Sequence, residues 1–298
     1  MPTPIFYDLN QCTDRRTAHI SSADTPARFM DFAEFRDAQT GNFHPIRSFK
    51  PAKKEDLCLV LGPKSVEGVS NGRDSNGFEN KEPHLPSTYL WAIGSLLAAS
   101  RAALADPAQP TCSPTSGFHH AHYEFGGNFR IFNGLLVVIA KLLQEQPHLK
   151  IGILDCDFHY GDGTDDQLRN QPTLARSIVL HTSCKNLHPI HDAVDYFQWL
   201  QLAINDINRK ECDLVIYLAG AGTQKNDPLS GMLTTRELRD RDRAVFGRMR
   251  SAIAWSFAGG YQENLNDSLE PDSVLQTHWN TLVESDLAGR MRKSRIGS

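Results

Sequence analysis

Short apolar runs alternate with amphipathic segments through the second half of the chain. Runs at 150–155, 177–181, 213–218 and 252–257 are bounded by polar residues and predict strands. Apolar residues at helical spacing predict helices over about 133–146, 194–209, 233–250 and 273–284. Strands that alternate with helices are typical of parallel βαβ units with both sheet faces covered. We therefore expect an α/β fold with three α/β/α layers and a mainly parallel central sheet.

The first half of the chain gives a weaker pattern. Residues 87–105 predict a helix that Ser87 or Thr88 could cap, and 10–56 predict loops with short helices. The apolar run 57–61 is too short to assign by period, and its composition favours a strand. Further on, Thr234 and Glu237 fit a capping box, and the basic tail after 284 is expected to fray. No repeat or linker divides the sequence, so we expect a single domain over 1–298.

Composition excludes several classes of protein. The 31 basic and 35 acidic residues give a net charge of −4, which offers no general electrostatic case for nucleic acid. The hydrophobic fraction of 40% excludes a mainly disordered chain. The longest apolar run, 134–140, is far shorter than the ~20 residues of a membrane span, and no signal peptide is visible. Six scattered cysteines predict reduced thiols in a cytoplasmic protein. A homo-oligomer remains open.

Two polar motifs could carry chemistry. His119 and His120 are adjacent in a loop, where both could reach one substrate, although a solvated or buried structural pair has the same pattern. Asp155, Asp157 and His159 alternate at the end of a predicted strand, so their side chains point to one side. A carboxylate and an imidazole two residues apart suit a divalent metal such as zinc. The alternative is an acidic turn.

Two glycine-rich segments also follow predicted strands. The segment 219–223 would let backbone approach a ligand closely, but it lacks the third glycine of a dinucleotide fingerprint, and a tight turn explains it as well. In the segment 258–261, Gly259 and Gly260 precede Tyr261, which would reach a cleft or pack in the core. All these motifs fall where the carboxyl ends of parallel strands meet.

Taken together and in order, the motifs resemble one family. Residues from about 85 to 262 are similar to the zinc-dependent histone deacetylases and their bacterial acetylpolyamine amidohydrolase relatives, which have the arginase–deacetylase fold. The matching segments are 116–129, 132–133, 155–163, 180–181, 219–231 and 259–261. The resemblance also implies that 57–61 belongs to a helix.

The resemblance implies a role for each matching side chain. The metal ligands would be Asp157 and His159, and the general base and acid would be His119 and His120. Asp155 and Asp162 would be the carboxylates that support the two histidines. Tyr261 would be the phenol that donates to the oxyanion, and Phe129 would form an aromatic wall of the acyl-lysine tunnel. Zinc is the implied cofactor, and a potassium ion is implied near Asp155.

The sequence departs from the family at three places. The third metal ligand of the family is an aspartate, and Gly222 occupies that position here. Asn128 replaces a glycine beside the substrate, and Arg130 replaces a small thiol with a cation that would repel a metal. A catalytic zinc normally has three protein ligands and a water. We therefore expect an impaired metal site.

The expected function follows from the matches and the departures. It is that of a zinc-dependent deacylase that hydrolyses an N-acyl amide of lysine or a polyamine, with acylated lysine or a small acylated amine as its partner. The alternative is a catalytically inactive protein of this fold that binds acylated ligands or a protein partner. A manganese ureohydrolase of the arginase type is disfavoured by the tandem histidines and by Tyr261.

Overall fold

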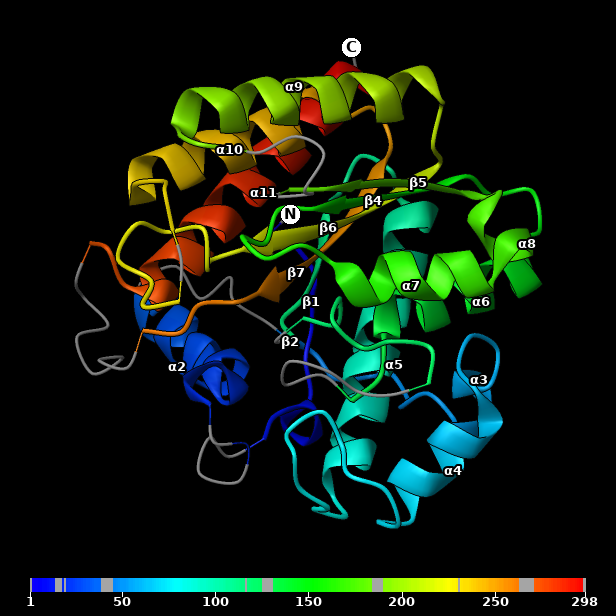
Figure 1. Cartoon of the computed structure of the whole chain (residues 1–298). Helices are drawn as coiled ribbons and strands as arrows, with labels where there is room; N and C mark the ends of the chain where they lie inside the picture. Colours follow the sequence, from blue (N-terminus) through cyan, green and yellow to red (C-terminus); the bar gives the residue numbers. More distant parts are fainter. Residues whose placement is uncertain are drawn as a thin grey trace.

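A single parallel sheet organises the molecule (Figure 1). A computed structural model describes residues 2–13, 18, 20–38, 45–115, 117–124, 131–183, 190–229, 231–262 and 271–296. The strand order is β2-β1-β3-β7-β6-β4-β5, and every neighbouring pair is parallel. The strands are β1 (Ile5–Phe6), β2 (Pro45–Ile46), β3 (Thr111–Ser113), β4 (Ile151–Asp155), β5 (Ile178–Thr182), β6 (Leu214–Gly220) and β7 (Ala252–Ala258).

Helices connect the strands and cover both faces of the sheet. The α-helices of the described residues are α2 (Thr25–Asp37), α3 (Lys54–Leu57), α4 (Pro63–Ser70), α5 (Leu85–Ala105), α6 (Gly134–Glu145), α7 (Asp162–Asn170), α8 (Pro172–Ala175), α9 (Ala193–Arg209), α10 (Thr235–Arg248) and α11 (Val274–Ile296). Two short 3-10 helices, Leu9–Gln11 and Ser21–Ala23, precede α2. None of the helices described is both long and apolar enough to cross a membrane.

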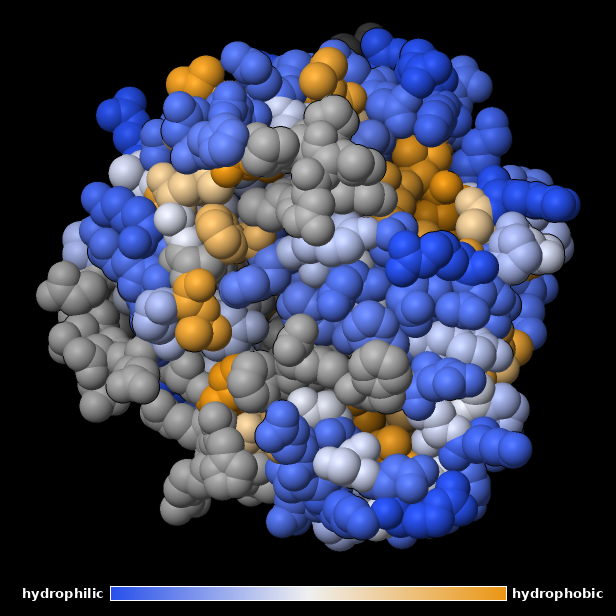
Figure 2. Space-filling view, in the orientation of Figure 1, coloured by the Kyte–Doolittle hydropathy of each residue, from blue (hydrophilic) through white to orange (hydrophobic). Residues whose placement is uncertain are grey.

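Alternate residues of β6 pack into two separate hydrophobic cores. Leu214, Ile216 and Leu218 pack into the core beneath α5 and α6, whereas Val215 and Tyr217 pack into the core beneath α2, α9, α10 and α11. Figure 1 shows the same division, with α9, α10 and α11 on one side of the sheet and α5 and α6 on the other. The face in Figure 2 is mainly hydrophilic, with small separate hydrophobic patches. The predicted three-layer α/β/α architecture is confirmed.

A buried ion pair ties the second helical layer to the sheet. Arg241 and Asp242 of α10 are fully buried, and Arg241 Nη2 lies 2.9 Å from Asp242 Oδ1. Arg241 Nη1 donates to the carbonyl of Gly220 at the end of β6 (2.6 Å). Asp242 accepts hydrogen bonds from the hydroxyls of Tyr217 on β6 and Thr281 on α11. One charged pair thus joins three elements.

The structure corrects several predicted boundaries. Helix α5 begins at Leu85, with Pro86 in its first turn, so Ser87 and Thr88 lie inside it rather than at its cap. The run 57–61 is not a strand, because α3 ends at Leu57 and a turn follows. The chain after 284 does not fray within the described part. It continues as α11, where Arg292 donates to the carbonyls of Phe246 and Met249 near the end of α10.

Candidate active site

The carboxyl ends of β4, β6 and β7 lie side by side because these strands are parallel neighbours. Asp155 is the last residue of β4, and Asp157 and His159 follow it. Gly222 lies just beyond β6, and Tyr261 lies just beyond β7. The sheet therefore brings segments more than 100 residues apart in the chain to one edge.

The tandem histidines each pair with a carboxylate. His119 Nδ1 lies 2.7 Å from Asp155 Oδ2, and His120 Nδ1 lies 2.6 Å from Asp162 Oδ1. The centroids of the two imidazole rings are 4.1 Å apart, and both histidines are buried. The predicted partnership of each histidine is thus confirmed. A carboxylate on Nδ1 fixes the orientation and the tautomer of an imidazole, which directs Nε2 to the reacting side.

The electrostatics of Asp162 fit a carboxylate that supports an imidazole. Burial would raise the pKa of Asp162, but the hydrogen bond with His120 and the charges of His120 and His122 outweigh it and lower the pKa to about 2. Asp162 therefore carries a negative charge throughout the neutral range. Such a charge favours the protonated form of the imidazole beside it.

Asp157 is a buried carboxylate with one unused oxygen. Its Oδ1 accepts the backbone N–H of His159 at 2.9 Å and lies 3.3 Å from His159 Nδ1. Its Oδ2 is buried and has no hydrogen-bond partner among the residues that the structure describes. Burial would raise the pKa of Asp157, but the His159 hydrogen bonds and the charge of His119 outweigh it and hold the pKa well below its usual range. A buried, ionised oxygen without a partner is what a cation ligand requires.

Tyr261 completes the group of side chains. Its ring centroid is 6.5 Å from that of His159, which is 6.1 Å from that of His120. The distance from Tyr261 to His159 agrees with the prediction that both belong to one site. Positive φ angles at Gly259 (61°) and Gly260 (90°) make the turn that delivers this tyrosine, and such angles favour glycine.

Gly222 leaves the place of the third ligand without a side chain. A Cβ on Gly222 would lie 3.9 Å from Asp157 Oδ2, so this position faces the unused oxygen. Across the described residues, no group of three or more histidine, cysteine, aspartate or glutamate side chains could hold a metal. The predicted ligands Asp157 and His159 are only two, which does not fit the three protein ligands that a catalytic zinc normally has.

Neighbouring polar side chains do not replace the missing aspartate. Asp227 Oδ2 accepts the backbone N–H of Tyr261 (2.7 Å), and its Oδ1 accepts that of Leu229 (3.0 Å). Gln224 Oε1 accepts the N–H of Asn226 (2.6 Å). Both side chains are thus engaged in shaping the loops around the site.

Other predicted features stay predictions. Asn128, Phe129 and Arg130, which were assigned to the substrate tunnel, lie outside the described residues. The potassium site near Asp155 is likewise untested.

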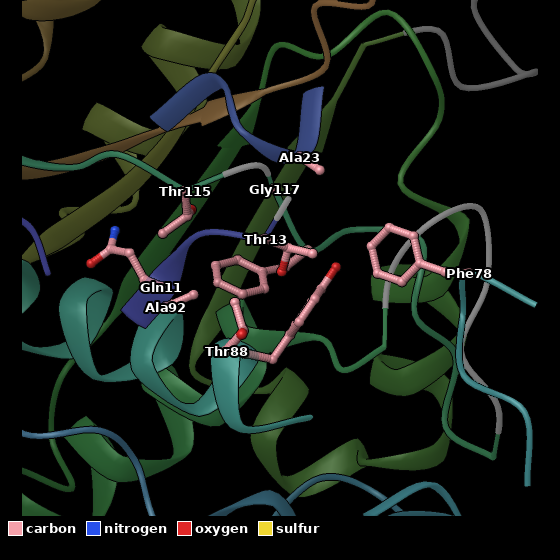
Figure 3. Close-up of a pocket in the computed structure, with 10 residues that line it drawn as sticks. Gln11, Thr13, Ala23, Phe78, Thr88, Ala92, Thr115 and Gly117 are labelled. Carbon is pink, nitrogen blue, oxygen red and sulfur yellow. The ribbon is translucent and has the colours of Figure 1, made fainter. Parts of the chain in front are cut away.

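A small cavity adjoins the loop that carries the tandem histidines (Figure 3). It measures about 20 Å³ and borders Gly117 and Phe118. The hydroxyl of Thr115, another lining residue, is buried, and no described residue forms a hydrogen bond with it. This volume has room for one water, which would satisfy that hydroxyl. No pattern in the sequence predicts this cavity, because its walls come from distant segments.

Comparison with known proteins identifies the family. The family model for the histone deacetylase domain matches residues 33–208, more than half of the chain. This chain belongs to the histone deacetylase family. The matched range contains both histidine–aspartate pairs, Asp157 and His159, whereas Gly222 and Tyr261 lie beyond its end.

Curated proteins match parts of the chain. An uncharacterized protein of Picosynechococcus sp. is 28% identical over 205 residues, which cover 62% of this chain and 67% of that protein. Acetylpolyamine amidohydrolase 2 of Pseudomonas aeruginosa is 25% identical over 174 residues, which cover 50% of each chain. The match thus spans half the length of the Pseudomonas protein.

A solved structure matches nearly the whole fold. Acetylpolyamine aminohydrolase from Burkholderia pseudomallei superposes with a TM-score of 0.71, covering 96% of this chain and 98% of that one, at 14% sequence identity. At this identity the match establishes the α/β fold of the deacetylase relatives and nothing finer.

Proposed function

We propose that this chain is a deacetylase-type amidohydrolase for N-acylated lysine or a small acylated amine. Its metal site binds zinc weakly, and the enzyme therefore hydrolyses its substrate slowly. Family membership supports the reaction class. The observation that carries the proposal is the convergence of two histidine–aspartate pairs, Asp157, His159 and Tyr261 at one edge of the sheet. The name of the Pseudomonas relative favours an acetylated polyamine as the small amine.

The side chains have complementary tasks in amide hydrolysis. His119, with Nδ1 directed at Asp155, presents Nε2 to remove a proton from the attacking water. His120, held by Asp162, returns a proton to the departing amine, without which an amine is a poor leaving group. The Tyr261 hydroxyl donates to the oxyanion of the tetrahedral intermediate. These tasks need no side chain at position 222.

A binding protein is the second candidate function, and Gly222 is the observation that favours it. Zinc in such enzymes polarises the acyl carbonyl and lowers the pKa of a bound water. Two ligands hold it less tightly than three, so a chain with Gly222 could keep its affinity for acylated amines while losing turnover. Both candidates use the same pocket, and they differ in whether the bound amide is cleaved.

Replacing Gly222 tests both candidates. Asp157 Oδ2 would be 3.9 Å from the new Cβ, so Gly222→Asp adds a second carboxylate, and with it a third ligand, to the predicted pair Asp157 and His159. We expect Gly222→Asp to raise zinc affinity by more than about 10–100-fold, the loss usually seen when a mere supporting partner is removed, and to raise the rate on acetyl-lysine and acetylpolyamine substrates. Titration calorimetry with zinc and a deacetylation assay measure the two effects.

Controls separate charge from bulk at position 222. Gly222→Asn has nearly the same size but ligates poorly, so it should leave zinc affinity and rate near those of the unmodified chain. Adding Arg130→Cys to Gly222→Asp should raise the rate further, if the arginine repels the metal. Tight stoichiometric zinc and ordinary turnover in the unmodified chain would contradict the proposal. Tight binding of an acetylated amine with no cleavage by Gly222→Asp would favour the binding protein.

A further inference from the structure

The outward face of α9 carries an exposed stripe without charge. Val194 and Leu202 are 63% and 69% exposed, although both are large and apolar. Gln198 and Asn205 are also exposed and continue the same face, because residues three or four apart are neighbours on a helix. In Figure 1 this helix lies at the outer margin of the molecule. The stripe is therefore accessible to another molecule.

A groove runs beside the stripe. It measures about 720 Å³, and its walls include Val194, Phe197 and Leu202 of α9 and Glu237 of α10. Phe197 is partly buried and packs against the core beneath α9, so it forms a fixed apolar wall. Exposed apolar side chains gathered around a hollow are typical of a surface that a partner covers.

The stripe is complementary to itself. Val194 comes four residues before Gln198, and Leu202 comes four residues after it. A two-fold axis at Gln198 therefore sets Val194 of one copy against Leu202 of a second copy, and Leu202 against Val194. The two Gln198 amides meet at the axis, where each can donate to the other because an amide both donates and accepts.

The charges at the two ends of α9 favour the antiparallel direction that such an axis requires. Asp192 and Asp195 lie at the start of α9, whereas Arg209 and Lys210 lie at its end. Both cations contact Asp206, yet Arg209 is 75% exposed and Lys210 is 48% exposed, so each can also reach a second carboxylate. Antiparallel packing brings the acidic start of each α9 towards the basic end of the other, and it opposes the two helix dipoles.

We propose that a second copy of this chain docks on α9, with the two helices antiparallel about a two-fold axis at Gln198. Helices that pack in this way lie about 8–10 Å apart, which allows Leu202 of each copy to enter the groove of the other. Identical surfaces repel when their centre is charged, and the centre of this stripe has no charge. The inference does not depend on the proposed function, since α9 contributes no residue to the candidate active site.

Sedimentation velocity of the full chain at about 1–100 µM tests the proposal, because this range spans ordinary dimer affinities. We expect the mass to rise with concentration from 33.3 kDa to twice that value. Leu202→Glu puts a charge into the apolar contact twice per dimer, so it should raise the dissociation constant by about 100-fold or more. Leu9→Glu is the matched control, because Leu9 is 68% exposed but lies outside α9, and it should have no effect. A chain that stays monomeric, or equal effects of the two variants, overturns the proposal.

Cysteine cross-linking tests the position of the axis. In a Cys58→Ser background, which lacks one exposed thiol, Gln198→Cys places two thiols at the axis. Asn205→Cys lies seven residues further along α9, so its two thiols would be roughly 20 Å apart, far beyond the reach of a disulfide. We expect oxidation to give a covalent dimer with Gln198→Cys and none with Asn205→Cys or with the background chain. If Leu202→Glu does not fold, this comparison decides the matter. No cross-link through Gln198→Cys, or equal cross-linking of both variants, overturns the proposal.

Discussion

Gly222 differs from the other glycines around the site because its backbone does not require one. A Cβ at Gly222 would meet its nearest neighbours at 3.6–3.9 Å, which is ordinary van der Waals contact. By contrast, a Cβ at Gly220 would lie 2.6 Å from the backbone of Asp157, and Gly259 has a φ of 61°. The missing ligand is therefore a matter of side-chain chemistry alone, and an aspartate at 222 would not strain the loop.

His278 is a buried histidine outside the site that makes stability depend on pH. It lies on α11 and stacks on Phe257 with ring centroids 3.8 Å apart, and neither of its ring nitrogens has a hydrogen-bond partner within the described part of the chain. Burial and the charge of Arg241 lower the pKa of His278 from 6.5 to about 3. Between those values the unfolded chain binds a proton that the folded protein does not, so stability falls as pH falls.

We therefore expect His278 to cost the fold about 2 kcal/mol of unfolding free energy between pH 7 and pH 5. His278→Phe keeps the aromatic stack and removes the titrating group, so its loss over this range should be smaller by that amount. Urea unfolding at both pH values measures the difference, with His148→Phe as a surface control. Equal losses in His278→Phe and the unmodified chain would show that His278 becomes protonated in the folded state.

At the scale of elements, the capping box of α10 was predicted correctly from the sequence. Thr234 Oγ1 accepts the N–H of Glu237 (3.2 Å), and Glu237 Oε2 accepts the N–H of Thr234 (2.7 Å). An N-cap side chain typically contributes about 1 kcal/mol by satisfying a free N–H of the first turn. This cap also fixes where α10 begins and hence how Arg241 reaches β6.

Thr234→Ala should lower the unfolding free energy by about 1 kcal/mol, and Thr234→Ser should retain most of the contribution of the cap. Ser87→Ala provides a matched contrast, because Ser87 was a sequence candidate for a cap but lies inside α5 and is exposed. Its effect should be close to zero or slightly stabilising, since alanine is the better helix former. Denaturant unfolding of the three variants gives the comparison. A loss in Ser87→Ala as large as in Thr234→Ala would be inconsistent with the cap.

Elements with a long periodic pattern were predicted well, and short ones were not. The apolar runs of β4 to β7 predicted those strands to within about two residues. The strands β1, β2 and β3 have only two or three residues, so no period can reveal them, and pairing with distant strands forms them. The length of α11 depends on Arg292 reaching α10, which is a tertiary contact and leaves no local pattern.

Within the site, sequence reasoning succeeded where motifs carry the chemistry. The partners of His119 and His120 followed from ordered motifs, and the structure agrees. His122 was visible in the same motif, but its link to Asp162 depends on how α7 folds against the loop. The room for a Cβ at Gly222 likewise depends on Gly259 and Gly260, which follow another strand.

At the scale of the whole molecule, the pair of Arg241 and Asp242 joins sheet and helices. Removing one member leaves the other charge buried without compensation, which typically costs about 3–5 kcal/mol. Arg241→Met should therefore lower the unfolding free energy by roughly that amount, and adding Asp242→Asn should recover part of it. Arg209→Met provides the control, because Arg209 is 75% exposed in its pair with Asp206 and should contribute under about 1 kcal/mol. Losses of similar size in Arg241→Met and Arg209→Met would show that the buried pair does not join the layers.

The order of strands has a consequence for how the protein is made. Of the strands that the structure describes, β7 comes last along the chain, yet it lies between β3 and β6 in the sheet. While the chain leaves the ribosome, β2-β1-β3 and β6-β4-β5 can each form, but neither block can join the other until β7 has emerged. Until then, strand edges at β3 and β6 are unpaired and open to wrong partners. Biosynthesis therefore holds the two halves of the site apart until β7 has been made, and the two form one pocket only when β7 closes the sheet.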